Sequence, residues 1–431
     1  MDTLTIGFVA IVAFLVLALL GLPLAFSFIT VGFAGLVMLR GAVPAMALLG
    51  ETPYASIASY LLAAVPLFVL MGQFAFYSGI SRDLFNAAHK WMSRLPGGLA
   101  QATMLACTAF AACTGSSVAS AATMSAVAYP EMERLNYSPR LATGTIAAGG
   151  ALGILIPPST IFIILGIITE QSIGTLFIAG FLPGLMLAGL FIILIFVMSR
   201  LNPSLGPPGE PSTWKEKFTS LTGIWGMLVL FILVLGGLYF GIFAPSEAGT
   251  VGAFGAFILA LTKRTPRNSL LKALVETAQT TAYILFILIG ATVFNTFLAL
   301  GGVSSAISNW ILSFSIPPML TVIVILIVYI PLGMFIDPLG AILLTVPVFY
   351  PIVTGLGFDP IWFLVLVCVM TELGLITPPV AINVYVVQGV TKVPMEEVFR
   401  GIVPFALVFL VGIALLVAFP QISLFLPGTM K

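Results

Sequence analysis

The sequence predicts an all-α polytopic membrane protein with two repeats of inverted topology. Each repeat holds a re-entrant helical hairpin and a broken transmembrane helix. Three observations predict this fold class. Of the 431 residues, 60% are apolar and only 7% are charged, far fewer charges than a soluble domain carries. Several apolar runs are long enough to cross a bilayer, and one motif with two central prolines occurs twice.

The repeated motif reads GGALGILIPPS at Gly149–Ser159 and MTELGLITPPV at Met370–Val380. The two copies lie 221 positions apart, and the same spacing holds without a gap on both sides of the motif. It relates Gly153 to Gly374, Pro157 to Pro378, Pro130 to Pro351, Pro139 to Pro360, and Gly180 to Gly401. The chain therefore contains an internal repeat.

Each proline pair falls inside an apolar run that would otherwise cross the membrane as one helix. Proline lacks the backbone donor and clashes with the preceding turn, so the helix must break there. A carbonyl group freed by the break is tolerated in hydrocarbon only where protein, water or a bound ion satisfies it. A single break is compatible with a kink that neighbouring helices satisfy, whereas repetition in both halves favours a binding site.

We expect residues 1–59 to form two spans and an interfacial helix that belong to a scaffold. Residues 60–200 form the first inverted repeat, with its hairpin at about 99–130 and its broken helix at about 141–169. A basic loop precedes this hairpin and carries Arg82, Lys90 and Arg94.

Residues 201–280 are expected to hold a Pro- and Gly-rich linker, a connecting arm helix and scaffold spans. Residues 281–431 form the second inverted repeat, with its hairpin at about 317–351 and its broken helix at about 361–391. The prediction therefore counts about ten spans and two hairpins.

The distribution of basic residues predicts the orientation in the membrane. With the N-terminus outside, 14 of the 16 Lys and Arg residues lie on the cytoplasmic side, and only Arg40 and Lys431 lie outside. The C-terminus is then also outside. The first hairpin enters from the cytoplasm and the second from the outer face, so halves of similar sequence have opposite topology. Such an arrangement is typical of an alternating-access carrier.

Hydroxyl groups gather at the tip of the first hairpin. They come from Thr114, Ser116, Ser117, Ser120 and Thr123. Small residues of this kind also allow close helix packing, which is the alternative interpretation. Together with carbonyl groups freed near Gly153 and Pro157, the hydroxyl groups would form an all-oxygen cage that suits a small hard cation such as sodium.

The tip of the second hairpin carries Asp337, and a carboxyl group at membrane depth is a functional hypothesis by default. Asp337 contacts an ion or the substrate, or it caps a half-helix of the hairpin. Glu372 replaces Ala151 of the first half. It would pair with another group, carry a proton or face a water-filled crevice.

Motifs of enzymes are missing from the sequence. It contains no HExxH, GxSxG or GxxxxGK[ST] motif, and its only histidine, His89, falls in the basic loop. The chain opens without a cleavable signal peptide, and its three cysteines have no metal-type spacing. We therefore expect no enzyme activity, no organic cofactor and no nucleic-acid partner.

The chain resembles the large membrane subunit (M subunit) of tripartite ATP-independent periplasmic (TRAP) transporters, within the wider ion-transporter superfamily. The resemblance covers essentially the whole chain. It is carried by TGSSVASAATM at Thr114–Met124, GGALGILIPPST at Gly149–Thr160, MFIDPLGAILLTVP at Met334–Pro347 and TELGLITPPVAINV at Thr371–Val384.

The resemblance implies a sodium-coupled importer in the bacterial inner membrane that works by an elevator motion. Its substrate would be an organic anion such as a C4-dicarboxylate, a sugar acid or sialic acid. It also implies two protein partners, a small four-span membrane subunit and a periplasmic substrate-binding protein. The alternatives are a stand-alone sodium- or proton-coupled carboxylate carrier of the same superfamily and, more distantly, a channel.

Site residues follow from the resemblance position by position. The first sodium site would involve Ser116, Ser117, Gly153 and Pro157. The second would involve Gly333, Asp337, Gly374, Thr377 and Pro378. The substrate would lie between the two tips, near Ser120, Thr123, Thr345 and Asn383.

Overall fold

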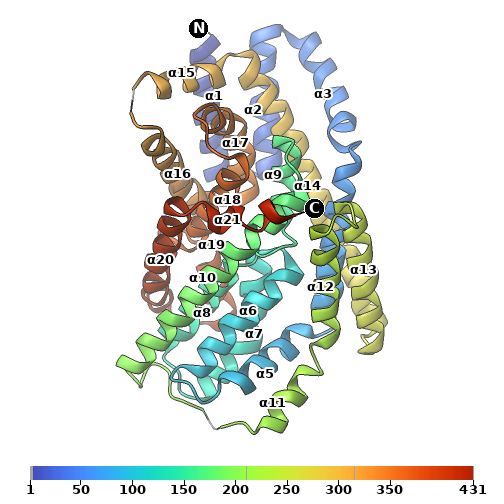
Figure 1. The fold of residues 1–431 in the computed structure, drawn as a ribbon. Coiled ribbons are helices and arrows are strands. Elements are labelled where there is room, and N and C mark those ends of the chain that lie inside the picture. Colours follow the sequence, from blue (N-terminus) through green and yellow to red (C-terminus); the bar gives the residue numbers. More distant parts are fainter. Residues whose placement is uncertain (1–2, 210, 315, 431) are drawn as a thin grey trace.

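The computed structural model describes residues 3–209, 211–314 and 316–430, and Lys431 lies outside them. Over these residues the regular structure is entirely helical. The helices form an elongated molecule, with α1 and α15 at one end and α5 and α11 at the other (Figure 1).

The chain up to the first hairpin forms α1 (Thr3–Leu19), α2 (Leu24–Arg40), α3 (Ala42–Ile57), α4 (Ala64–Tyr77) and α5 (Ile80–Met92). The rest of the first half forms α6 (Gly98–Thr114), α7 (Ser117–Arg134), α8 (Pro139–Gly150), α9 (Thr160–Thr169) and α10 (Ile173–Leu201). Three helices then follow the linker, α11 (Trp214–Leu221), α12 (Trp225–Tyr239) and α13 (Pro245–Thr262).

The second half begins with a long helix and repeats the order of the first. It comprises α14 (Arg267–Leu300), α15 (Val303–Ser313), α16 (Pro318–Phe335), α17 (Pro338–Gly355), α18 (Pro360–Ile376), α19 (Ile382–Thr391), α20 (Met395–Ala418) and the short α21 (Gln421–Leu424).

The helix boundaries confirm the internal repeat. The ends of α6 and α16, the beginnings of α7 and α17, and the beginnings of α8 and α18 are each 221 residues apart. Both proline pairs lie where the sequence predicts a break, between α8 and α9 and between α18 and α19. Each half therefore contains a helical hairpin followed by a broken helix.

The two hairpins enter the molecule from opposite ends, and their tips meet near its middle (Figure 1). The base of the first hairpin lies beside α5, where α6 packs closely on that helix. The second hairpin starts instead after α15, at the opposite end. The two tips therefore lie close together, whereas the two bases lie at opposite ends of the molecule.

A separate group of helices flanks the hairpins. In it α14 packs along α2 and α4, and α13 packs along α4 (Figure 1). The crossing of α2 and α14 is close because Gly32 carries no side chain: a Cβ atom there would lie 2.8 Å from the Cα atom of Phe294. Contact of this kind is common where helices associate in a membrane.

The predicted basic loop before the first hairpin is wrong, since this segment forms the helix α5. Ile80, Leu84, Phe85 and Ala87 are buried on one side of it, whereas Arg82 is exposed. Such helical spacing of apolar residues predicts an amphipathic helix, and the basic charges obscured it. The basic residues of this segment therefore lie largely on a helix and not in a loop.

The boundary expected at residue 281 falls inside α14, which runs unbroken for 34 residues. No proline lies within this helix to end it. By length and composition six of the described helices could each span a membrane, and these include α16 and α17. The two halves of a hairpin therefore resemble ordinary spans when each helix is judged alone.

Candidate functional site

The tip of the first hairpin is the two-residue connection Gly115–Ser116 between α6 and α7. Ser116 caps α7, because its hydroxyl oxygen accepts the N–H of Ala119 at 3.3 Å. Gly153, in the break after α8, packs directly against the tip: a Cβ atom there would lie 2.7 Å from the carbonyl oxygen of Ser116. The sequence therefore needs glycine at position 153 for the hairpin tip to reach the break.

Both breaks contain backbone carbonyl groups that accept no backbone hydrogen bond from the described residues. Within the described residues, no backbone N–H is bonded to the carbonyl groups of Gly153, Leu155, Ile156 and Pro157 in the first break. The same holds for the carbonyl groups of Ile376 to Val380 in the second break. In the first break these residues are buried, and a buried carbonyl group normally finds a partner, which a bound cation or water would supply. In the second break Pro378 and Pro379 are exposed.

The second tip, Ile336–Asp337, repeats this packing. A Cβ atom on Gly374 in α18 would lie 2.5 Å from the Cα atom of Gly333 in α16. Asp337 caps α17, since its side chain accepts the N–H of Leu339 at 2.9 Å. Asp337 therefore caps a helix and also lines the cavity between the two tips.

A hydrogen bond joins the two halves. The hydroxyl group of Ser117, at the start of α7, donates to Oε1 of Glu372 in α18 at 2.5 Å. Glu372 is fully buried, and among the described residues its second oxygen, Oε2, has no partner. A carboxyl group from the second repeat is thus held by the hairpin tip of the first.

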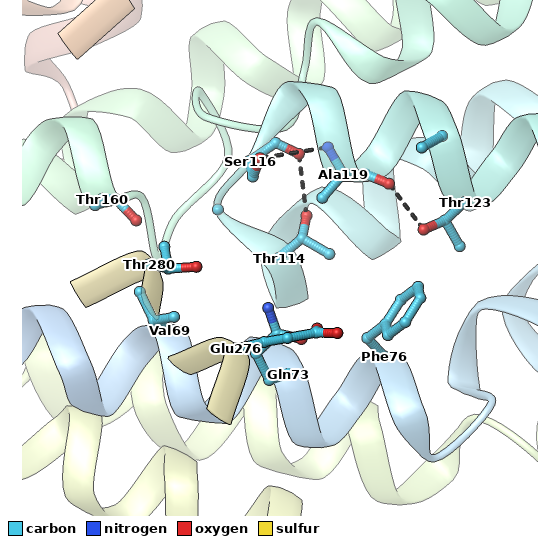
Figure 2. A pocket seen from close by; sticks show the side chains of 13 residues that line it. Val69, Gln73, Phe76, Thr114, Ser116, Ala119, Thr123, Thr160, Glu276 and Thr280 are labelled. Carbon is cyan, nitrogen blue, oxygen red and sulfur yellow. Dashed lines mark hydrogen bonds between the residues drawn. The ribbon is translucent and has the colours of Figure 1, made fainter. Parts of the chain in front are cut away.

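Two adjoining cavities lie at the tips. The smaller, of about 150 Å³, is bordered by both hairpin tips and by Asp337 and Glu372. The larger, of about 260 Å³, lies between the first tip and helices α4 and α14 (Figure 2). Gly115, Ser116, Thr160 and Thr280 border both of them. The walls of both cavities lack Lys, Arg and His among the described residues.

The four residues expected at the substrate have different surroundings. Thr123 lines the larger cavity. Ser120 is buried and hydrogen-bonded to Thr114 at 2.8 Å, and the hydroxyl group of Thr345 donates to the carbonyl of Ala341 within α17 at 2.7 Å. Asn383 is fully buried, and both atoms of its amide lack a partner among the described residues. Only Thr123 of the four therefore borders a cavity described here.

Most of the residues expected to bind sodium lie at the hairpin tips or in contact with them. Ser116, Ser117 and Asp337 line the smaller cavity, and Gly153 and Gly374 each contact a tip. Thr377 donates its hydroxyl to the carbonyl of Leu373 at 2.6 Å, and Pro157 and Pro378 lie in the breaks. These residues offer oxygen atoms, which fits the preference of a hard cation.

Sequence reasoning did not identify Gln73, Glu276 and Thr280, which line the larger cavity on the side opposite the first tip (Figure 2). A signal for Glu276 was present. It is half-buried in α14, a helix long and apolar enough to span a membrane, and it accepts a hydrogen bond from Tyr77. An ionisable residue in such a helix indicates function in the same way as Asp337.

Two hairpins that meet tip to tip, each packed on a broken helix, define a membrane carrier with inverted repeats. A protein family described as "Tripartite ATP-independent periplasmic transporter, DctM component" matches residues 11–422. The chain belongs to this family. It is therefore a multi-pass protein of the inner membrane and a transport protein, not an enzyme.

Three curated relatives illustrate the family. A C4-dicarboxylate TRAP transporter large permease protein from Pseudomonas aeruginosa is 35% identical, over 86% of each chain. A sialic acid TRAP transporter large permease protein from Vibrio cholerae is 30% identical, over 94% of this chain and 95% of its own. An isethionate TRAP transporter permease protein, DctMQ, from Oleidesulfovibrio alaskensis is 30% identical, over 96% of this chain but 65% of its own.

The fold also resembles a solved transporter. The YdaH transporter of Alcanivorax borkumensis superimposes with a TM-score of 0.66 over 88% of this chain and 89% of its own. Only 14% of the aligned residues are identical, so this comparison supports the fold alone.

Proposed function

We propose that the chain is the permease subunit of a sodium-coupled importer that moves an organic anion inward by alternating access. One observation carries this proposal. Both hairpin tips, each packed on a broken helix with unbonded carbonyl groups, border one cavity in the middle of the molecule. Paired breaks near the middle of a membrane protein are typical of substrate and ion sites in secondary transporters.

Electrostatics supports the coupling of substrate to sodium. Asp337 and Glu372 border the smaller cavity, and neither cavity has a basic residue in its described wall. Carboxylate groups without bound cations would repel an anionic substrate. Sodium ions at the two tips would offset this repulsion, so the anion would bind well only after sodium. The first site would use oxygens of Ser116, Ser117, Gly153 and Pro157, and the second those of Gly333, Asp337, Gly374, Thr377 and Pro378.

We further propose an elevator motion. In this proposal the hairpins and broken helices of residues 60–200 and 281–431 move against a scaffold that includes residues 1–59 and the spans within 201–280. The close packing of α2, α4, α13 and α14 supports a separate scaffold, and in this proposal α4 and α14 also belong to it. Both termini would lie in the periplasm, as the distribution of basic residues predicts.

The partners in this proposal are a small four-span membrane subunit and a periplasmic substrate-binding protein. The description of the family supports them, because it names a tripartite periplasmic transporter. Relatives of similar identity are named for different substrates, a C4-dicarboxylate and sialic acid, which supports an organic anion as the class.

The testing experiment is uptake into proteoliposomes that contain this chain and the small subunit. Labelled organic acids are supplied with and without an inward sodium gradient, and with and without the binding protein. We expect uptake to require both. Uptake by this chain alone, without the binding protein, would support a stand-alone carrier instead. Uptake that ignores the sodium gradient would contradict the proposed coupling.

A further inference from the structure

The larger cavity has two unlike walls (Figure 2). One wall comes from the first hairpin and α9 and carries the hydroxyl groups of Ser116, Thr123 and Thr160. The other comes from α4 and α14 and carries Gln73, Glu276 and Thr280. A molecule in this cavity would therefore contact the first hairpin on one side and a carboxyl group on the other.

The polar groups of this cavity are only partly engaged. Glu276 accepts a hydrogen bond from the hydroxyl group of Tyr77 at 2.5 Å through Oε1, which orients the carboxyl group. Its other oxygen, Oε2, receives no hydrogen bond from the residues that the structure describes. The side chains of Gln73, Thr160 and Thr280 likewise make no hydrogen bond within the described part of the chain. These groups are free to bond to a ligand.

Charge limits which ligand fits. Glu276 is the one ionisable residue among the described residues that line this cavity. A carboxylate group next to it would meet a like charge with no basic residue to compensate, and juxtaposition of like charges costs several kcal/mol. A hydroxyl or ammonium group, in contrast, would donate a hydrogen bond to the free oxygen.

We propose that Glu276 forms an acceptor subsite that selects a carboxylic acid bearing hydrogen-bond donors besides its carboxyl group and excludes a second carboxylate. Tyr77 positions this carboxyl group, and Gln73 and Thr280 complete the subsite. Two kinds of acid offer this chemistry, a sugar acid through hydroxyl groups and an amino acid through its ammonium group. The inference rests on the proposed function, because it concerns the substrate of the same transporter.

The test uses the permease with its small subunit in proteoliposomes under an inward sodium gradient. Three labelled probes are compared in the presence of the binding protein: glucuronate, proline and succinate. We expect uptake of glucuronate or proline, which distinguishes hydroxyl from ammonium donors, and no competition by succinate. Discrimination relies on placing an unfavourable group against the wrong ligand.

The variant Glu276→Gln keeps the shape of the side chain and removes its charge. We expect the preference for the donor-bearing acid over succinate to fall by about tenfold or more, since each 1.4 kcal/mol corresponds to a factor of ten. The matched control is Glu51→Gln, the same change on an exposed position of α3, and it should keep the wild-type preference. Thermal stabilisation by sodium is measured for both variants to show that each is folded.

Two results would overturn the inference. Wild-type uptake of succinate as good as that of glucuronate and proline would show that the acidic wall does not exclude a dicarboxylate, while leaving the proposed importer intact. An unchanged preference in a folded Glu276→Gln variant would do the same. Absence of sodium-driven uptake for every acid would instead overturn the proposed function and this inference together.

Discussion

At the scale of single residues, the second tip concentrates two roles in one side chain. Asp337 caps α17 through the N–H of Leu339 and also borders the cavity between the tips. The two interpretations left open by the sequence are thus both compatible with its position. A substitution that preserves capping but removes charge separates them.

The variant Asp337→Asn is such a substitution, because Asn and Asp cap helices about equally well. We expect the unfolding temperature without sodium to change little, and the sodium concentration for half-maximal uptake to rise by about tenfold or more, since charged ligands account for much of the affinity of a cation site. Sodium titrations of uptake and of thermal stability in nanodiscs measure both quantities.

Asp359→Asn is the matched control for this prediction. Asp359 caps α18 by accepting the N–H of Trp362 at 3.1 Å, and it borders neither cavity. Its replacement should leave sodium dependence unchanged. If Asp337→Asn behaved like this control, the carboxyl group would be a helix cap only.

At the scale of helices, the sequence predicts features that depend only on residues near one another in the chain. A Pro-Pro pair ends a helix wherever it lies, so both broken helices follow from the sequence alone. The helix α5 was missed because charge dominated its segment, although its apolar residues recur at helical spacing. The bond between Ser117 and Glu372 joins residues 255 positions apart, and no local pattern predicts such a contact.

The contact between the first hairpin tip and Gly153 in the first break leads to a testable prediction. In Gly153→Ala, the new Cβ atom would lie 2.7 Å from the carbonyl oxygen of Ser116, so the tip must shift. We expect a loss of about 1–3 kcal/mol in stability, typical of overpacking, and weaker binding of sodium. Thermal unfolding and a sodium titration measure the two effects.

Gly189→Ala provides the comparison within α10, because a Cβ atom at Gly189 would meet nothing within 4 Å. Alanine at such a helical position stabilises by about 1 kcal/mol relative to glycine. A Gly153→Ala variant that gained stability in the same way, with normal sodium binding, would show that the tip does not depend on this contact.

At the scale of the whole molecule, the elevator proposal predicts which pairs of helices must slide. Asn295 in α14 donates its amide to the carbonyl of Leu343 in α17 at 3.1 Å, so this pair bridges the proposed scaffold and the second hairpin. A reducible cross-link in Asn295→Cys/Leu343→Cys should abolish uptake, and a reductant should restore it. The native cysteines Cys107, Cys113 and Cys368 are first replaced by alanine.

A second pair serves as the control for this experiment. Arg140 in α8 and Glu397 in α20 form an ion pair with bonds of 2.5 and 3.0 Å. Because α20 packs along α8 of the first broken helix, we expect the two helices to move together. A cross-link in Arg140→Cys/Glu397→Cys should leave uptake intact. Undiminished uptake by the oxidised Asn295→Cys/Leu343→Cys variant would contradict sliding at the contact between α14 and α17.

The bond between Ser117 and Glu372 has a consequence for how the two halves relate to each other. The residues at the corresponding positions are Pro338 and Ala151, each 221 places away. Two copies of the first half, assembled as a symmetric pair, would set serine against alanine, and two copies of the second would set proline against glutamate. Only one half of each kind reproduces the contact. The duplicated halves are therefore no longer interchangeable, and each now depends on the other.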